Sequence, residues 1–177
     1  MAKGSGPQRG LVQVYSGHGK GKTTAALGLA LRAAGHGLKV IVVQFMKDEP
    51  QTGEQLFANR YHPFEVVAPA EDRGSVASAD EMSSLMEQTL ARSRDILLQG
   101  GYQVVILDEV LTALDLGYLA ESEVLGLMAH KPGAVELVLT GRRAPAEIVR
   151  QADLVTEMLM IKHPSAEGIE RRKGIDY

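Results

Sequence analysis

The fold is decided by the stretch Val12-Gln13-Val14-Tyr15-Ser16-Gly17-His18-Gly19-Lys20-Gly21-Lys22-Thr23-Thr24, in which an apolar segment runs into a glycine-rich turn. The sequence that follows, Ala25-Ala26-Leu27-Gly28-Leu29-Ala30-Leu31, is typical of a helix. Glycines let backbone N–H groups curl around a phosphate chain, and the helix N-terminus adds a partial positive charge. This order of strand, turn and helix therefore predicts that the protein binds a nucleoside triphosphate.

The turn supplies the candidate ligands for the triphosphate: Gly17, His18, Gly19, Lys20, Gly21, Lys22, Thr23 and Thr24. Lys22 can reach the phosphates, and the hydroxyl of Thr23 can ligate Mg²⁺. The spacing departs from the pattern G-x-x-x-x-G-K-[ST], because Ser16 stands where the first glycine is expected and Lys20 adds a second amine. A plain glycine turn between strand and helix is the alternative, and the flanking pattern disfavours it.

Composition narrows the class of protein. The length of 177 residues suits one domain, and a hydrophobic content of 45% is enough for a substantial core. The net charge is −3 with both signs interspersed, which does not favour nucleic acid as a partner. The chain has no cysteine, so disulfides, thiolate metal sites and a cysteine nucleophile are excluded. Without an apolar leader or a run of transmembrane length, we expect a cytoplasmic protein that does not enter membranes.

Apolar runs and helical patterns alternate along the rest of the chain. Strands are expected at residues 11–15, 38–45, 64–67, 102–107, 135–139 and 154–161. Helices are expected at 21–34, 79–99, 110–116, 121–129 and 145–151, with a capping box at Ser78 and Glu81 and a short helix after Gly53. The alternation predicts a three-layer α/β, P-loop NTPase-like fold with a mostly parallel, doubly wound sheet. Residues 1–10 are predicted to be a flexible arm, and 11–177 a single domain.

Two acidic residues, Asp108 and Glu109, end the apolar run Val104–Leu107. In open α/β sheets ligands bind beyond the carboxyl ends of the strands. Mg²⁺ prefers one or two carboxylates together with phosphate oxygens. The candidate metal ligands are therefore Thr23, Asp108 and Glu109, and a solvated acidic pair at a strand end is the alternative.

Two arginines are further candidates for contact with the nucleotide. Arg142 follows another predicted strand, in Thr140-Gly141-Arg142-Arg143, where a guanidinium can bind phosphate through two hydrogen bonds. Arg32 lies roughly three turns into the helix after the glycine-rich loop, and a surface arginine is an equally good interpretation of it. The candidate catalytic residues are Lys22, Thr23, Glu109 and Arg142.

The segments that carry a family resemblance are Tyr15–Gly28, Arg32–Gly37, Val43–Lys47, Val105–Glu109, Leu139–Arg142, Ala152–Met158, Lys162–Pro164 and Lys173–Ile175. Together they resemble the P-loop type of ATP:corrinoid adenosyltransferase, an enzyme of cobalamin biosynthesis or salvage. The resemblance covers nearly the whole chain from about residue 11, and it includes the shifted first glycine. The sequence ADLVTEM followed by KHP is far more specific than a phosphate loop alone.

The resemblance implies that the 5′-deoxyadenosyl group of ATP is transferred to the cobalt of a reduced corrinoid, with release of triphosphate. It also implies Mg²⁺, a homodimer, and a reductase or other electron donor that converts Co(II) to Co(I). Residues 17–24 would hold the triphosphate, and Arg32, Glu109 and Arg142 would contact ATP or its Mg²⁺. Because the corrinoid supplies the nucleophile, the protein needs only to position the reactants and stabilise charge. His163 is interpreted as a structural histidine in the turn before Pro164.

The chain departs from the family at residues 66–75, where family members often carry aromatic residues that press on the lower corrin face. No aromatic residue stands between Phe64 and Tyr102. Three hypotheses remain open: a precursor substrate without a lower base, a substitute role for Phe57, Tyr61 or Phe64, or loss of activity on corrinoids.

Two other functions compete with adenosyl transfer. An ordinary P-loop NTPase or phosphotransferase would act at the γ-phosphate and could use Arg142 or Arg143 as its finger. A non-catalytic carrier of a corrinoid or nucleotide would bind without turnover. Release of triphosphate, rather than of ADP and phosphate, would distinguish adenosyl transfer from the first of these.

Overall fold

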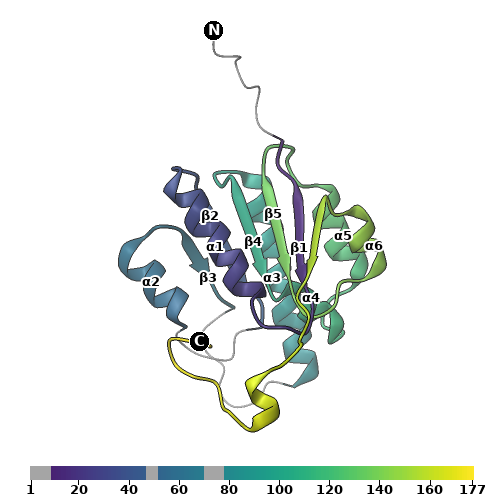
Figure 1. The fold of residues 1–177 in the computed structure, drawn as a ribbon. Helices are drawn as coiled ribbons and strands as arrows, with labels where there is room; N and C mark the ends of the chain where they lie inside the picture. The colour runs from purple at the N-terminus through teal and green to yellow at the C-terminus, as the bar shows by residue number, and fades with distance from the viewer. Residues whose placement is uncertain (1–8, 47–51, 70–77) are drawn as a thin grey trace.

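The computed structural model describes residues 9–46, 52–69 and 78–177. In these residues the strands form one parallel sheet in the order β3-β2-β4-β5-β1-β6, with helices on both faces (Figure 1). The strands are β1 (Val12–Ser16), β2 (Val40–Gln44), β3 (Glu65–Val67), β4 (Val104–Asp108), β5 (Glu136–Thr140) and β6 (Leu154–Glu157). The predicted three-layer, doubly wound α/β fold is confirmed.

Two helical layers sandwich the sheet. The helices are α1 (Lys22–Gly35), α2 (Gly53–Tyr61), α3 (Ala79–Gln99), α4 (Val110–Asp115), α5 (Glu121–Ala129) and α6 (Ala146–Gln151), followed by the 3₁₀ turn η1 (Pro164–Glu167). Successive side chains of β4 lie on opposite faces of the sheet, as the two-residue period of a strand requires. Val104 and Ile106 pack with α1 and α2, whereas Val105 and Leu107 pack with α3, α4, α5 and α6. Every residue of β4 is buried, as expected for a strand covered on both faces.

Most predicted boundaries agree with the structure. The capping box at the start of α3 is confirmed: the Ser78 hydroxyl accepts from the Glu81 N–H, and the Glu81 carboxylate accepts from the Ser78 N–H at 2.7 Å. The predicted last strand is too long, because β6 ends at Glu157 rather than at residue 161. The residue after β6, Met158, is bonded to the glycine-rich loop instead. Met158 N–H donates to Ser16 O at 2.8 Å, and Gly19 N–H donates to Met158 O at 2.7 Å.

The parallel topology places the ends of β1, β4 and β5 at one edge of the sheet. β5 lies between the other two, so Ser16, Asp108 and Thr140 come to the same edge. The C-terminal tail, residues 158–177, crosses beneath this edge toward α2 (Figure 1).

The predicted arm at residues 1–10 and the departure at residues 66–75 lie largely outside the described residues. Within the described parts of the chain, none of the helices is long and apolar enough to cross a membrane.

Candidate active site

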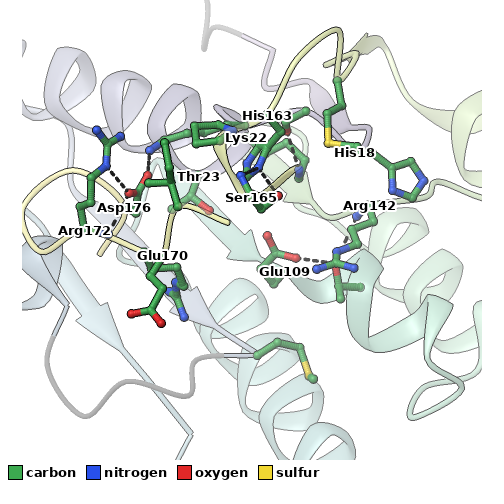
Figure 2. Close-up of a pocket in the computed structure, with 18 of the residues that line it drawn as sticks. His18, Lys22, Thr23, Glu109, Arg142, His163, Ser165, Glu170, Arg172 and Asp176 are labelled. Carbon is green, nitrogen blue, oxygen red and sulfur yellow. Dashed lines mark hydrogen bonds and ion pairs between the residues drawn. The ribbon is translucent and has the colours of Figure 1, made fainter. Parts of the chain in front are cut away.

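Two adjoining cavities of about 760 and 430 Å³ open at this edge and share five lining residues: Lys20, Lys22, Thr23, Glu109 and Asp176. The larger cavity also contains the predicted residues His18, Gly19 and Arg142. The smaller contains Gly21 and Thr24 together with Leu27 of α1. Figure 2 shows Asp176 and Arg172 to one side of the larger cavity and Arg142 and His18 to the other. The structure therefore brings most of the sequence-predicted site residues to one place.

The two lysines of the glycine-rich loop have different surroundings. Lys22 is 9% exposed, and its ammonium donates to Gly17 O at 2.8 Å and to Gly19 O at 2.9 Å. Burial lowers the pKa of Lys22, while the nearby carboxylate of Glu109 opposes that shift. The Lys20 ammonium instead bonds to the tail, at Asp176 and at Ile175 O. Lys22 is thus the lysine held inside the loop, beside the acidic pair.

Glycine is required at positions 17 and 19 for a steric reason. Gly17 has a φ of +108°, and a Cβ on it would lie 2.3 Å from the carbonyl oxygen of Met158. A Cβ on Gly19 would lie 2.7 Å from the same oxygen. Side chains cannot be accommodated at such distances, so the tail's approach requires glycine at both positions. Gly21, with a φ of +127°, completes the turn into α1.

Asp108 lies behind the acidic end of the site and lines neither cavity. It is 1% exposed, and its Oδ1 accepts hydrogen bonds of 2.8 Å from the hydroxyls of Thr23 and Thr140. Thr140 in turn accepts from the Glu109 N–H at 2.8 Å. These bonds tie the start of α1 to the ends of β4 and β5.

Glu109 has a left-handed backbone conformation, with a φ of +63°, and it caps α4. Its carboxylate accepts a hydrogen bond from the Thr112 hydroxyl. The same hydroxyl oxygen accepts from Arg142 N–H at 3.1 Å. Thr112, which no sequence pattern singled out, therefore connects Glu109 to the turn that carries Arg142.

The donor set suits Mg²⁺ held together with phosphate. Among the described residues, no group of three or more His, Cys, Asp or Glu side chains could hold a metal by itself. Magnesium in nucleotide sites requires only one or two carboxylates, since substrate phosphates and waters complete its octahedron. Thr23 and Glu109 line both cavities, and Asp108 lies directly behind Thr23, bonded to its hydroxyl; this set fits that requirement.

The turn after β5 fixes Arg142 beside the loop. The Arg142 carbonyl accepts from Gly17 N–H at 2.9 Å. A Cβ on Gly141 would lie 2.5 Å from the backbone nitrogen of Thr112, so this turn packs directly on α4. The neighbouring Arg143 instead forms an exposed ion pair with Asp115 at 3.7 Å, and it does not line either cavity.

Other predicted residues lie elsewhere. Arg32 is exposed in the last turn of α1 and lines neither cavity. Phe64 is buried against α1 and α2, so it is not available to a large planar ligand, and that part of the second hypothesis is wrong. Phe57 and Tyr61 are exposed on α2 with ring centroids 5.0 Å apart, but they also line neither cavity. The described residues leave open a precursor substrate without a lower base and a substitute role for Phe57 or Tyr61.

The C-terminal tail is the main part of the site that sequence reasoning missed. It contributes His163, Ser165, Glu170, Arg171, Arg172 and Asp176 to the larger cavity. The polar sequence of the tail shows no periodicity. Only Lys162–Pro164 and Lys173–Ile175, two of the segments that carry the family resemblance, indicated that the tail belongs to the site. His163 has the structural role predicted for it, since its Nδ1 accepts from Ser165 N–H at 3.2 Å and caps η1.

Comparison with known proteins identifies the family. A sequence model of the family described as ATP:corrinoid adenosyltransferase BtuR/CobO/CobP matches residues 8–177. The chain belongs to this family. A corrinoid adenosyltransferase of Pseudomonas aeruginosa is 36% identical over 173 residues, covering 96% of this chain and 85% of the relative. Those of Salmonella typhimurium and Escherichia coli K12 are 35% and 33% identical, covering 96% of this chain and 87% of each relative. The predicted activity, ATP-dependent adenosylation of corrinoids by a transferase, is thereby confirmed.

Solved structures support the fold alone. The chain is similar to a KaiC-like protein of Pyrococcus horikoshii, with a TM-score of 0.54 and 16% identity over 86% of this chain and 74% of that one. It is also similar to the RadB recombinase, with a TM-score of 0.54 and 15% identity over 91% of this chain and 80% of that one. The P-loop NTPase-like architecture is therefore shared by proteins of very different sequence.

Proposed function

We propose that this protein transfers the 5′-deoxyadenosyl group of ATP to the cobalt of a reduced corrinoid and releases triphosphate. The observation that carries the proposal is the convergence of Lys22, Thr23 and Asp108 at one edge of the sheet. Family membership over nearly the whole chain supports the corrinoid as the acceptor. Nothing at the site favours attack at the γ-phosphate over this reaction.

The proposed step needs no nucleophile from the protein. The electron pair of Co(I) forms the bond to C5′ of ATP, and the bond between C5′ and the triphosphate oxygen breaks. The leaving triphosphate takes that bonding pair, and cobalt is formally oxidised to Co(III). The protein's part is to hold the two reactants in line and to stabilise the charge of the leaving group.

Cationic groups stand where that charge would develop. Lys22 is fixed by its own loop carbonyls before any ligand arrives, so it is pre-organised for a phosphate chain. Arg142 lines the larger cavity and would bind a phosphate on the opposite side. The backbone N–H groups of residues 17–24 and the N-terminus of α1 would supply further hydrogen bonds and positive potential.

Mg²⁺ is part of this proposal. Thr23, Asp108 and Glu109 would hold it, and the hydrogen bond from Thr23 to Asp108 already keeps two of these groups together. When bound, the ion would neutralise part of the triphosphate charge. The reaction also requires a reductase or other electron donor, because the cobalt must be reduced to Co(I). The reducing environment of the cytoplasm suits such a step.

We also propose a homodimer. Strand β6 is exposed along its whole length, including the apolar side chains of Leu154 and Val155. Parallel sheets are normally covered on both faces, and exposed apolar edge strands invite pairing. Sedimentation of the Val155→Glu variant tests this proposal: we expect the dimer to dissociate, and an unchanged dimer would place the interface elsewhere.

An anaerobic assay with ATP, Mg²⁺ and chemically reduced corrinoids tests the reaction. We expect the absorption spectrum of a Co–C bonded product and one triphosphate per product. ADP and phosphate would overturn the proposal in favour of an NTPase, and tight binding without turnover would favour a carrier. The assay should be run on corrinoids with and without a lower base, since only a corrinoid with a lower base must lose an axial ligand. The comparison tests whether the missing aromatic segment reflects the choice of substrate.

A further inference from the structure

The last six residues, 172–177, form a compact turn that we call the C-terminal hook. Its backbone is closed on itself by hydrogen bonds from Asp176 N–H to Arg172 O at 2.8 Å, from Ile175 N–H to Arg172 O at 3.1 Å and from Gly174 N–H to Tyr177 O at 2.8 Å. These bonds make the hook a compact element that holds its own shape.

Asp176 holds the hook together and fastens it to the glycine-rich loop. Its carboxylate accepts from the Arg172 N–H at 2.9 Å, from the Arg172 Nε–H at 3.1 Å and from the Lys20 ammonium. Lys20 also donates to Ile175 O at 3.0 Å. Lys20 above all holds the pKa of Asp176 well below its usual range. The Asp176 carboxylate is thus the point at which the hook is joined to the loop.

The hook forms one wall of the smaller cavity. Gly174, Ile175, Asp176 and Tyr177 line it, facing Thr24 and Leu27 of α1 and Gly53 and Glu54 of α2. A Cβ on Gly53 would lie 3.9 Å from Tyr177 O, so the hook reaches from the loop to the start of α2. The hook therefore closes one side of the smaller cavity, between the glycine-rich loop and α2.

We propose that Asp176 is a positioning residue and that Lys20 serves the nucleotide site by anchoring the hook rather than by binding phosphate. Lys22 is buried and points inward, whereas the Lys20 side chain is 46% exposed and both its hydrogen bonds go to the hook. The proposal rests on the proposed function and adds a division of labour between the two loop lysines.

A double-mutant cycle of Lys20→Ala, Asp176→Ala and the double variant tests this division, with steady-state kinetics in the anaerobic assay. We expect each single variant to raise the KM for ATP about 10-fold, with kcat changed less than about twofold. The double variant should match the singles, because the same contact is lost in all three. The control is Lys162→Ala, which removes the exposed ion pair of the same tail with Glu167 and should leave KM unchanged.

A second measurement does not depend on turnover. Carboxypeptidase should release Tyr177 faster from both single variants than from the wild type, and equilibrium binding of ATP should weaken in both. These readings remain available even where no adenosylcorrinoid forms, an outcome that would refute the proposed function alone.

Three results would overturn the proposal. Effects that multiply in the double variant would show that Lys20 binds phosphate independently of Asp176. A lower KM in Asp176→Ala would show that the carboxylate competes with ATP. An unchanged KM and an unchanged rate of Tyr177 release would show that the contact positions nothing.

Discussion

The glycine-rich loop and the C-terminal tail line the same cavities but are built in opposite ways. The loop lies between a buried strand and a long helix, and its lysine Lys22 is almost fully enclosed. The tail is exposed, with Ile161 89% accessible, and polar contacts at Asp176 and a few backbone bonds attach it. The loop is thus supported by packing on both sides, while the tail is held mainly by polar contacts. Local stability commonly varies within one protein, and segments that cover a binding site tend to lie at its lower end.

Replacing Lys22 should have the largest effect, because it removes the enclosed cation of the loop. We expect Lys22→Ala to lower kcat/KM for adenosyl transfer about 100- to 1000-fold, the cost typical of losing one pre-organised charge-stabilising group. Thermal unfolding of the apoprotein should change little. Near-normal activity would refute the role assigned to the loop, and Lys22→Arg serves as the control that keeps the charge but not the geometry.

Gly17 tests the place where loop and tail touch. Gly17→Ala combines a φ of +108° with a Cβ only 2.3 Å from Met158 O, so we expect it to lower the free energy of unfolding by about 2–4 kcal/mol. Chemical denaturation measures the change. The matched control is Gly28→Ala in α1, where nothing lies within 4 Å of the new Cβ; there we expect a gain of about 0.5–1 kcal/mol. Equal effects at both glycines would contradict the close approach.

Arg142 lies at the border between the two regions, bonded to the loop through its backbone and facing the cavity that the tail closes. We expect Arg142→Ala to lower kcat/KM about 10- to 100-fold. Its neighbour provides the comparison, since Arg143→Ala removes only an exposed ion pair and should change activity less than about twofold. Equal losses in the two variants would show that Arg142 has no special contact with the nucleotide.

Met160 should give the smallest effect, although it lines the larger cavity. Its side chain is exposed in the tail, so Met160→Ala should change the free energy of unfolding by less than about 0.5 kcal/mol. Denaturation with urea measures this directly. A loss comparable to that of Gly17→Ala would mean that the tail contributes to the folded core, and the contrast drawn above would fail.

Much of the site could be predicted because its chemistry depends on residue types at fixed spacings. Asp108 ends a strand, the glycine-rich loop, Glu109 and Arg142 follow strands, and the carboxyl ends of parallel strands meet at one edge. Arg32 shows the limit of that reasoning. It lies in the last turn of α1, too far along the helix to line either cavity. Phe64 shows another limit, because local sequence does not reveal that two helices cover it.

By itself the sequence determined the layered parallel sheet, the phosphate loop and the acidic strand end, because apolar periodicity and glycine placement express local backbone requirements. Only the tertiary structure decided why residue 17 must be glycine, because the backbone of Met158 lies against it. It likewise decided that Lys20 reaches Asp176, a contact between residues 156 positions apart. Contacts of that range depend on where the chain returns in space, and no local pattern records them.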